Sequence, residues 1–321
     1  MSPIKTEFEI RLAVSDADLQ QYADMCAKLR PDQTTTVQEL RDQDGTMPPE
    51  SNFERQLFIS NGEVIAASNT MQGFWTPEKG LYMISVKLGE NAPDELCQFM
   101  LDQLTERVKV HGATKINIWI PTIHESMVRA IESSGYTFDQ ANPESMLELE
   151  KLDLSQFQEA VDSLMSSDLR VISLQDLLAE DPENGMRRYH ELDIRLTQDI
   201  PLPWEFSGEP LESFEKSFML ESHTFDTIQV VLDGEKLIGT SMLFRNRHNP
   251  IYFLTGLTGV DREYRRRGIA KAIKAMNFNL AKEKGGKFLF CDNEEKNPML
   301  QLNYQLGFKP YWVWNSYTKN L

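Results

Sequence analysis

The sequence predicts an α/β protein that contains two copies of one domain. Landmark residues recur in the same order at an offset of about 172–174 residues, and in each copy apolar β-favouring runs alternate with runs of helical period. The recurring landmarks include the glycine pairs Gly62 and Gly234, Gly112 and Gly285, and Gly135 and Gly307. We therefore predict a first domain at residues 1–151, a linker at 152–168 and a second domain at 169–321.

In the first copy we expect a strand, one or two helices, a hairpin that continues to a third strand, and then helix, strand, helix and strand. Ser15 is the candidate N-cap of the first helix, and Asn61-Gly62 is a hairpin turn. The expected strands are Ile10–Ala13, Gln56–Ile59, Val64–Met71, Leu81–Val86, Ile116–Ile120 and Ser145–Leu149, and the expected helices are Asp16–Leu29, Asp94–Val110 and Glu125–Ser133.

The second copy should repeat this plan after a linker that is compatible with one short helix. It opens with a strand near Arg170–Ser173 and closes with Tyr311–Tyr317. An apolar strand at Ile251–Val260 leads into a helix that ends at Gly285-Gly286, and Phe288–Phe290 is the next strand.

The composition is that of a soluble globular protein with a strong negative charge. The net charge of −16 argues against general binding to nucleic acid or to anionic membranes. A well-solvated surface explains this charge, and a cationic substrate such as an amine is the alternative. No apolar run is long enough for a transmembrane helix, and no signal peptide is visible. Cys26, Cys97 and Cys291 are few and widely spaced, as reduced thiols in a cytoplasmic protein are, and they suggest neither disulfides nor a metal site.

The most informative segment joins the strand that ends at Val260 to the helix that follows. Arg265, Arg266 and Arg267 precede Gly268, Ile269 and Ala270. Free N–H groups and the positive end of the helix dipole attract anions at such a helix start. Gly268 permits close approach of a ligand to the backbone, and Ala270 keeps the first turn open. This arrangement suits a pyrophosphate.

The segment resembles the Gcn5-related N-acetyltransferase (GNAT) family, whose Q/R-x-x-G-x-G/A loop matches Arg265-x-x-Gly268-x-Ala270. The resemblance implies that each copy is a GNAT-like domain with a mixed, mostly antiparallel sheet, flanking helices and one splayed strand pair. It also implies that Arg265, Arg266, Arg267, Gly268, Ile269 and Ala270 bind the pyrophosphate of acetyl-coenzyme A (acetyl-CoA), which serves as co-substrate.

By the same resemblance, the backbone of Thr258, Gly259 and Val260 would bind the pantetheine arm and the thioester carbonyl, and Gly256 and Gly259 fit a bulged strand. Asn297 is placed for a helix N-cap with Pro298 at the first helical position, and in relatives this asparagine also contacts the cofactor.

Proton transfer is less well defined by the sequence. Many relatives carry a tyrosine acid where this chain has Asn303, and Tyr304 lies about 100° further around the helix. Asn303 could bind the arm or the sulfur, and Tyr304 is the alternative contact with the reaction. The candidate bases are Asp193, Glu205, Glu221 and His223, and Pro201–Trp204 is a candidate acceptor wall.

The first copy has Gly89–Glu95 where the second has its arginines, and these residues carry carboxylates and Pro93. Carboxylates near a pyrophosphate are unfavourable, so we predict that this copy is degenerate and does not bind coenzyme A (CoA). A separate ligand there is the alternative.

The resemblance as a whole implies an enzyme that transfers acetyl to a primary amine of a small molecule by direct attack in a ternary complex, without a metal. The alternatives are a protein acceptor, either an N-terminus or a lysine, and a non-catalytic acyl-CoA sensor. The oligomeric state is open, with a homodimer as one alternative.

Overall fold

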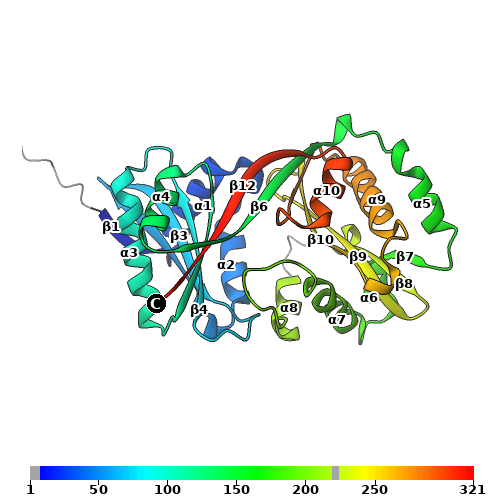
Figure 1. Ribbon diagram of the computed structural model, residues 1–321, viewed down its shortest axis with the longest axis horizontal. Coiled ribbons are helices and arrows are strands. Elements are labelled where there is room, and N and C mark those ends of the chain that lie inside the picture. Colours follow the sequence, from blue (N-terminus) through cyan, green and yellow to red (C-terminus); the bar gives the residue numbers. More distant parts are fainter. Residues whose placement is uncertain (1–7, 219–223) are drawn as a thin grey trace, which may run out of the picture. The chain divides into compact units, whose positions relative to one another are not determined.

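The computed structural model describes residues 8–218 and 224–321, which form two compact units (Figure 1). Unit 1 contains residues 8–142, Pro203–Glu205 and Trp312–Leu321, and unit 2 contains the other described residues. Short 3-10 turns lie at Pro31–Gln33, Pro49–Ser51, Leu149–Lys151, Ser155–Phe157, Phe225–Thr227 and Arg262–Tyr264.

The sheet of unit 1 has the strand order β1-β2-β3-β4-β5-β12. Its neighbours are antiparallel except for β4 and β5, which are parallel over Leu81–Ser85. The strands are β1 (Phe8–Leu12), β2 (Glu54–Ser60), β3 (Glu63–Gln72), β4 (Leu81–Leu88), β5 (Lys115–Pro121) and β12 (Lys309–Asn320), and the helices are α1 (Asp16–Leu29), α2 (Val37–Thr46), α3 (Asp94–Val110) and α4 (Glu125–Ser133).

Helices cover both faces of this sheet, because alternate residues of the strands point to opposite sides. Met100 of α3 and Ile131 of α4 pack with Ile84 and Ile118 on one face. On the other face, Tyr22 of α1 packs with Leu40 of α2 and with Leu57, Ile59 and Ala67 of the sheet.

The sheet of unit 2 has the order β6-β11-β10-β9-β8-β7, and only β10 and β11 are parallel. The strands are β6 (Thr137–Glu148), β7 (Arg170–Ser173), β8 (Gln229–Asp233), β9 (Lys236–Arg245), β10 (Tyr252–Val260) and β11 (Phe288–Asp292), and the helices are α5 (Gln158–Met165), α6 (Leu174–Glu180), α7 (Gly185–Thr197), α8 (Leu211–Phe218), α9 (Ile269–Glu283) and α10 (Pro298–Gln305). Both sheets are thus mixed and mostly antiparallel, as the sequence predicts.

Helix α9 lies on one face of the unit 2 sheet and α6 and α7 on the other. Ile273 of α9 packs with Val231 and Ile238, and helix α5 of the predicted linker supports α9 through Ala160 and Leu164. Tyr189 of α7 packs on the opposite face with Val230 and Met242.

Equivalent caps begin the first helix of each copy. The Ser15 side chain accepts from the Asp18 N–H at 3.2 Å, and the Ser173 side chain accepts from the Asp176 N–H at 3.0 Å. Both are capping boxes, and the first confirms the predicted N-cap.

The two copies exchange the ends of their last strands. Pro143–Glu148 of β6 belongs to unit 2, where Glu144–Glu148 pairs with β11, and Trp314–Asn320 of β12 pairs with β5 in unit 1. The units therefore differ from the predicted domains 1–151 and 169–321, which keep each closing strand in its own copy. The linker 152–168 belongs to unit 2.

Candidate cofactor and acyl-transfer site

The predicted pyrophosphate loop leads from β10 through the turn Arg262–Tyr264 to the start of α9. Arg266 and Gly268 both have left-handed backbones, with φ of 61° and 78°. Gly268 is the N-cap of α9 and supplies no side-chain acceptor, so the first-turn N–H groups have no partner within the helix. The loop thus presents backbone donors at a positive helix end.

The three arginines of this loop have different environments. The Arg265 guanidinium binds the Asp199 carboxylate, and its Nε donates to the Val260 carbonyl at 2.9 Å. Arg267 donates to the Glu263 carbonyl at 2.8 Å. The exposed Arg266 side chain makes no hydrogen bond or ion pair with any other described residue.

Asp199 is a neighbour of the loop that the sequence analysis did not identify. Its carboxylate also accepts from Arg262 Nε at 3.0 Å, and the hydrogen bonds from Arg262 and Arg265 hold its pKa below the usual value. It lies directly after α7, 66 residues before Arg265, and no local pattern links the two.

Strand β10 separates from β11 beside this loop. The two strands pair only over Tyr252–Leu254, whereas β10 continues beside β9 to Val260. A register shift between Thr255 and Thr258 confirms the predicted bulge at Gly256. The residues Thr258–Val260 that were predicted to bind the arm follow the bulge, and Leu196 of α7 lies 3.2 Å from where a Cβ on Gly259 would stand.

Helix α10 begins as predicted. The Asn297 side chain accepts from the Met299 N–H at 2.9 Å, and Pro298 occupies the first turn. Tyr304 is half-buried against the cluster that contains Phe278 and Phe308, and its hydroxyl has no hydrogen-bond partner within the described part of the chain.

Asn303 lies inside the protein, with 0% of its surface exposed. Its Oδ1 accepts from Lys274 Nζ at 2.6 Å, and its Nδ2 donates to Asn293 Oδ1 at 2.7 Å and to Cys291 Sγ at 3.2 Å. These contacts use both amide donors of Asn303, and its predicted contact with the cofactor stays a prediction.

Lys274 is another residue that the sequence analysis did not identify. Only 2% of its surface is exposed, and it has no ion pair with any described carboxylate. Burial lowers the pKa of the Lys274 amine, and burial raises the pKa of the neighbouring Cys291 thiol to about 12. Both shifts favour the uncharged forms of these two side chains.

The candidate bases lie in different places. Burial and the nearby Glu209 raise the pKa of Asp193 on α7 to about 7. Glu205 clusters with unit 1, where its N–H donates to Glu78 at 3.3 Å and the adjoining Trp204 ring lies 6.4 Å from Trp75. Glu221 and His223 lie outside the described residues.

The equivalent loop of the first copy has a different backbone. The Gly89 N–H donates to the Ile65 carbonyl at 2.9 Å, and the Ala92 N–H donates to Gly89 at 3.0 Å. None of the residues Gly89–Pro93 has a positive φ, and Asp94 and Glu95 occupy the first turn of α3. The N–H groups of Gly89 and Ala92 are thus used within the first copy, and the absence of CoA binding there stays a prediction.

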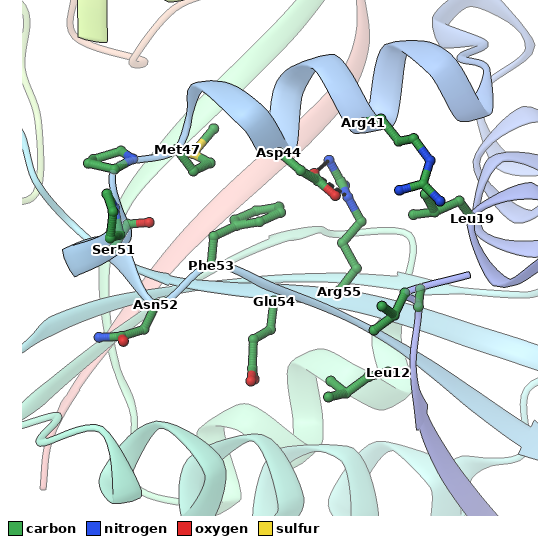
Figure 2. Close-up of a pocket in the computed structure, with 14 residues that line it drawn as sticks. Leu12, Leu19, Arg41, Asp44, Met47, Ser51, Asn52, Phe53, Glu54 and Arg55 are labelled. Atoms are coloured by element: carbon green, nitrogen blue, oxygen red, sulfur yellow. Dashed lines mark hydrogen bonds and ion pairs between the residues drawn. The ribbon is translucent and has the colours of Figure 1, made fainter. Parts of the chain in front are cut away.

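Unit 1 has a pocket of about 480 Å³ between α2 and β2 (Figure 2). Apolar side chains such as Leu12, Met47 and Phe53 line it together with charged ones. Figure 2 shows Arg55 beside Asp44, and the two form an ion pair at 2.8 Å. The other charged side chains that line the pocket, Arg41 and Glu54, also form ion pairs. The pocket therefore indicates no particular charge in a ligand.

No helix within residues 8–218 and 224–321 is both long and apolar enough to span a membrane. In the same residues, no group of three or more His, Cys, Asp or Glu side chains could hold a metal ion.

One family model matches part of the second copy. Residues 189–308 match the family model of the acetyltransferase (GNAT) family. No curated protein sequence matched the chain.

Solved structures of GNAT proteins resemble this chain over nearly its full length. A tandem GNAT protein from the clavulanic acid biosynthesis pathway has a TM-score of 0.69 and 16% identity, with 98% of each chain covered. A GCN5-related N-acetyltransferase from Sphaerobacter thermophilus has the same score and identity, covering 98% of this chain and 95% of that one. A glucosamine N-acetyltransferase region of a fungal multi-domain β-N-acetylglucosaminidase scores 0.69 at 12% identity, and this chain spans 38% of that protein. These likenesses show a tandem GNAT fold.

Proposed function

We propose that this chain, in which residues 189–308 form a GNAT domain, is an N-acetyltransferase that transfers acetyl from acetyl-CoA to a primary amine of a small molecule. The fold is one that supports acyl-CoA-dependent N-acyltransfer. The observation that carries the proposal is the loop Arg265–Ala270, in which two left-handed residues present backbone donors and the free Arg266 side chain at the start of α9.

In this proposal the second copy holds the co-substrate and the first copy is structural. Loop N–H groups and Arg266 bind the pyrophosphate, and Asn297 lies at the start of α10 beside the arm. The backbone N–H groups after the bulge, at Thr258–Val260, bind the arm and polarise the thioester carbonyl. No metal takes part.

Asp193 is the base that we favour among the candidates. A base that removes a proton from an amine works best with a pKa near the working pH, and the pKa of Asp193 is raised to about 7. Asp193 lies on the face of α7 that also carries Tyr189, whose hydroxyl is 3.1 Å from Thr240 of β9, and Leu196, which approaches Gly259.

The acceptor is a cationic amine in this proposal, because the chain has a net charge of −16 and Asp193 and Glu209 lie together in unit 2. A protein N-terminus or lysine is the second acceptor class. A non-catalytic acyl-CoA sensor is favoured by one observation, since Asn303 stands where many relatives have a tyrosine acid and is buried.

Mass spectrometry of products from an amine library incubated with acetyl-CoA tests the proposal. We expect acetylated small amines with the wild-type protein and, at limiting acetyl-CoA, far less product with Arg266→Glu. Parallel incubations with peptides that carry a free N-terminus or lysine test the protein acceptor. CoA binding without any product would favour the sensor, and the absence of CoA binding would refute all three.

A further inference from the structure

Helix α9 carries two buried polar side chains, one turn apart, that face the place where β10 and β11 separate. Lys274 Nζ donates to Asn303 Oδ1 at 2.6 Å. Asn303 in turn donates to Asn293 and Cys291 at the end of β11. Asn277 donates to the carbonyl and hydroxyl oxygens of Ser241 on β9 at 2.8 and 3.0 Å. Ser241 in turn lies 3.1 Å from the Thr258 hydroxyl on β10.

Each of these side chains therefore contacts one side of the separation. Lys274 binds the side formed by β11 and α10, and Asn277 binds the side formed by β9 and β10. Because residues on one face of a helix keep a fixed spacing, α9 sets the distance between the two sides of the separation. The two sides meet only at Tyr252–Leu254, where β10 and β11 still pair.

Lys274 is an unusual choice for such a role. A fully buried lysine is rare without a carboxylate partner, because its ammonium loses hydration. Here its one hydrogen-bond partner in the described chain is the neutral Asn303 amide. The neighbouring Cys291 on β11 is an uncharged thiol, and Asp292 and Glu144 act on that thiol from β11 and β6. Burial without a carboxylate partner therefore disfavours the ammonium form of Lys274.

We propose that Lys274 is a positioning residue of the CoA site, whose hydrogen bond orients Asn303 and so keeps the β10–β11 separation open for the pantetheine arm. The proposal rests on the proposed function, because it assigns the separation to the arm of CoA. It adds that protonation of Lys274 disturbs the site. CoA affinity should therefore fall as the pH is lowered through the pKa of Lys274, which burial places below the usual 10.5.

The test compares CoA binding by isothermal titration calorimetry, over a range of pH, for the wild type, Lys274→Met and Phe278→Leu. Methionine keeps the length and apolar stem and removes the hydrogen bond to Asn303. Phe278→Leu perturbs the same helix in the core and removes none of the hydrogen bonds between Lys274, Asn303, Asn293 and Cys291. We expect Lys274→Met to bind CoA about fivefold more weakly, which corresponds to one lost hydrogen bond.

The pH profile separates positioning from general stability. CoA itself titrates, and its contribution is the same for every variant. The wild type and Phe278→Leu should share an additional pH dependence that Lys274→Met lacks. Asn303→Leu should weaken binding as much as Lys274→Met does, and the double variant should be no weaker than either single one.

A second measurement does not depend on CoA. Nuclear magnetic resonance of isotopically labelled lysine should show one side-chain signal, missing in Lys274→Met, that titrates below the usual 10.5. A Lys274 that titrates as an exposed lysine would overturn the inference. Wild-type affinity and pH profile in a folded Lys274→Met protein would also overturn it. If the wild type bound no CoA, the proposed function and the assignment of the separation to the pantetheine arm would both be refuted. A lowered Lys274 pKa in that case would support only the uncharged state of the amine.

Discussion

The Asp199 carboxylate binds the Arg265 guanidinium, although the two residues lie 66 positions apart in the chain. The same carboxylate binds Arg262, so one anion at the end of α7 joins two of the arginines that follow β10. The main role of Arg265 in this structure is therefore to stabilise the loop. Arg266, which binds no other described residue, is left to meet an anionic ligand.

The first prediction concerns Arg266→Glu. Charge reversal beside the pyrophosphate should lower CoA affinity by at least about tenfold, because an attraction becomes a repulsion at a helix start. Equilibrium binding at constant salt measures the effect. Arg129→Glu on α4 of unit 1 changes the net charge equally and should leave the affinity unchanged. Equal losses in the two variants would refute a local role for Arg266.

The second prediction concerns the ion pairs of Asp199 with Arg262 and Arg265. The pKa of Asp199 is lowered in the folded protein, so the stability it contributes is present above its unfolded pKa of 3.8 and is lost as the pH falls through the lower folded value. Thermal unfolding of the wild type and Asp199→Asn should differ at pH 7 and converge in acid. A difference that persisted at the lowest pH would mean that the charge of Asp199 is not the source.

The third prediction separates backbone strain from binding. Gly268→Ala forces alanine into a left-handed conformation and should cost about 1 kcal/mol of folding free energy, since the nearest atom to the new Cβ is 4.0 Å away and no clash is added. Gly285→Ala, after α9, has a φ of 81° and open space, and it should cost about the same. CoA affinity should fall only for Gly268→Ala. An equal fall in both variants would point to stability alone.

The fourth prediction concerns pH and Asp193. Its pKa of about 7 means that the carboxylate is increasingly protonated below neutrality, so kcat/KM for amine acetylation should fall as the pH drops below about 7. Asp193→Asn should lower kcat/KM and remove this limb of the profile. An unchanged limb in the variant would assign it to another group.

The same raised pKa has a consequence for stability with a defined sign. The folded protein binds a proton at Asp193 more tightly than the unfolded chain does, so stability falls as the pH rises from 3.8 through about 7. Asp193→Asn should therefore be more stable than the wild type at pH 8 and similar to it at pH 4. Chemical denaturation at both values of pH measures this.

Local signals were enough to predict much of the fold and the loop. Helices α1 and α3 begin and end at the predicted residues, because each combines an apolar stripe with a clear start and stop. The left-handed Gly268 and the cap at Asn297 follow from residue type and spacing. Those features depend on a few neighbouring residues, which a sequence displays directly.

Features set by distant contacts could not be predicted. The pattern of β6 and β12 shows that they are strands and does not show which sheet each one joins, so the exchange of their ends was missed. Lys274 follows Ile273 on a helix where a lysine is expected to reach solvent, and only the position of α10 buries it against Asn303. Asp199 lies in a connecting segment, and its role depends on how α7 packs beside β10.

The exchanged strand ends also determine the order in which the chain can complete its folding during synthesis. Asn117 on β5 donates to Ser316 on β12 at 2.7 Å, and these residues are 199 positions apart. The ribosome must translate most of the second copy before the sheet of the first can close. Until then β5 has an unpaired edge, which is a template for unwanted association. The copy that is made first therefore keeps an exposed sheet edge until synthesis of the chain is almost complete.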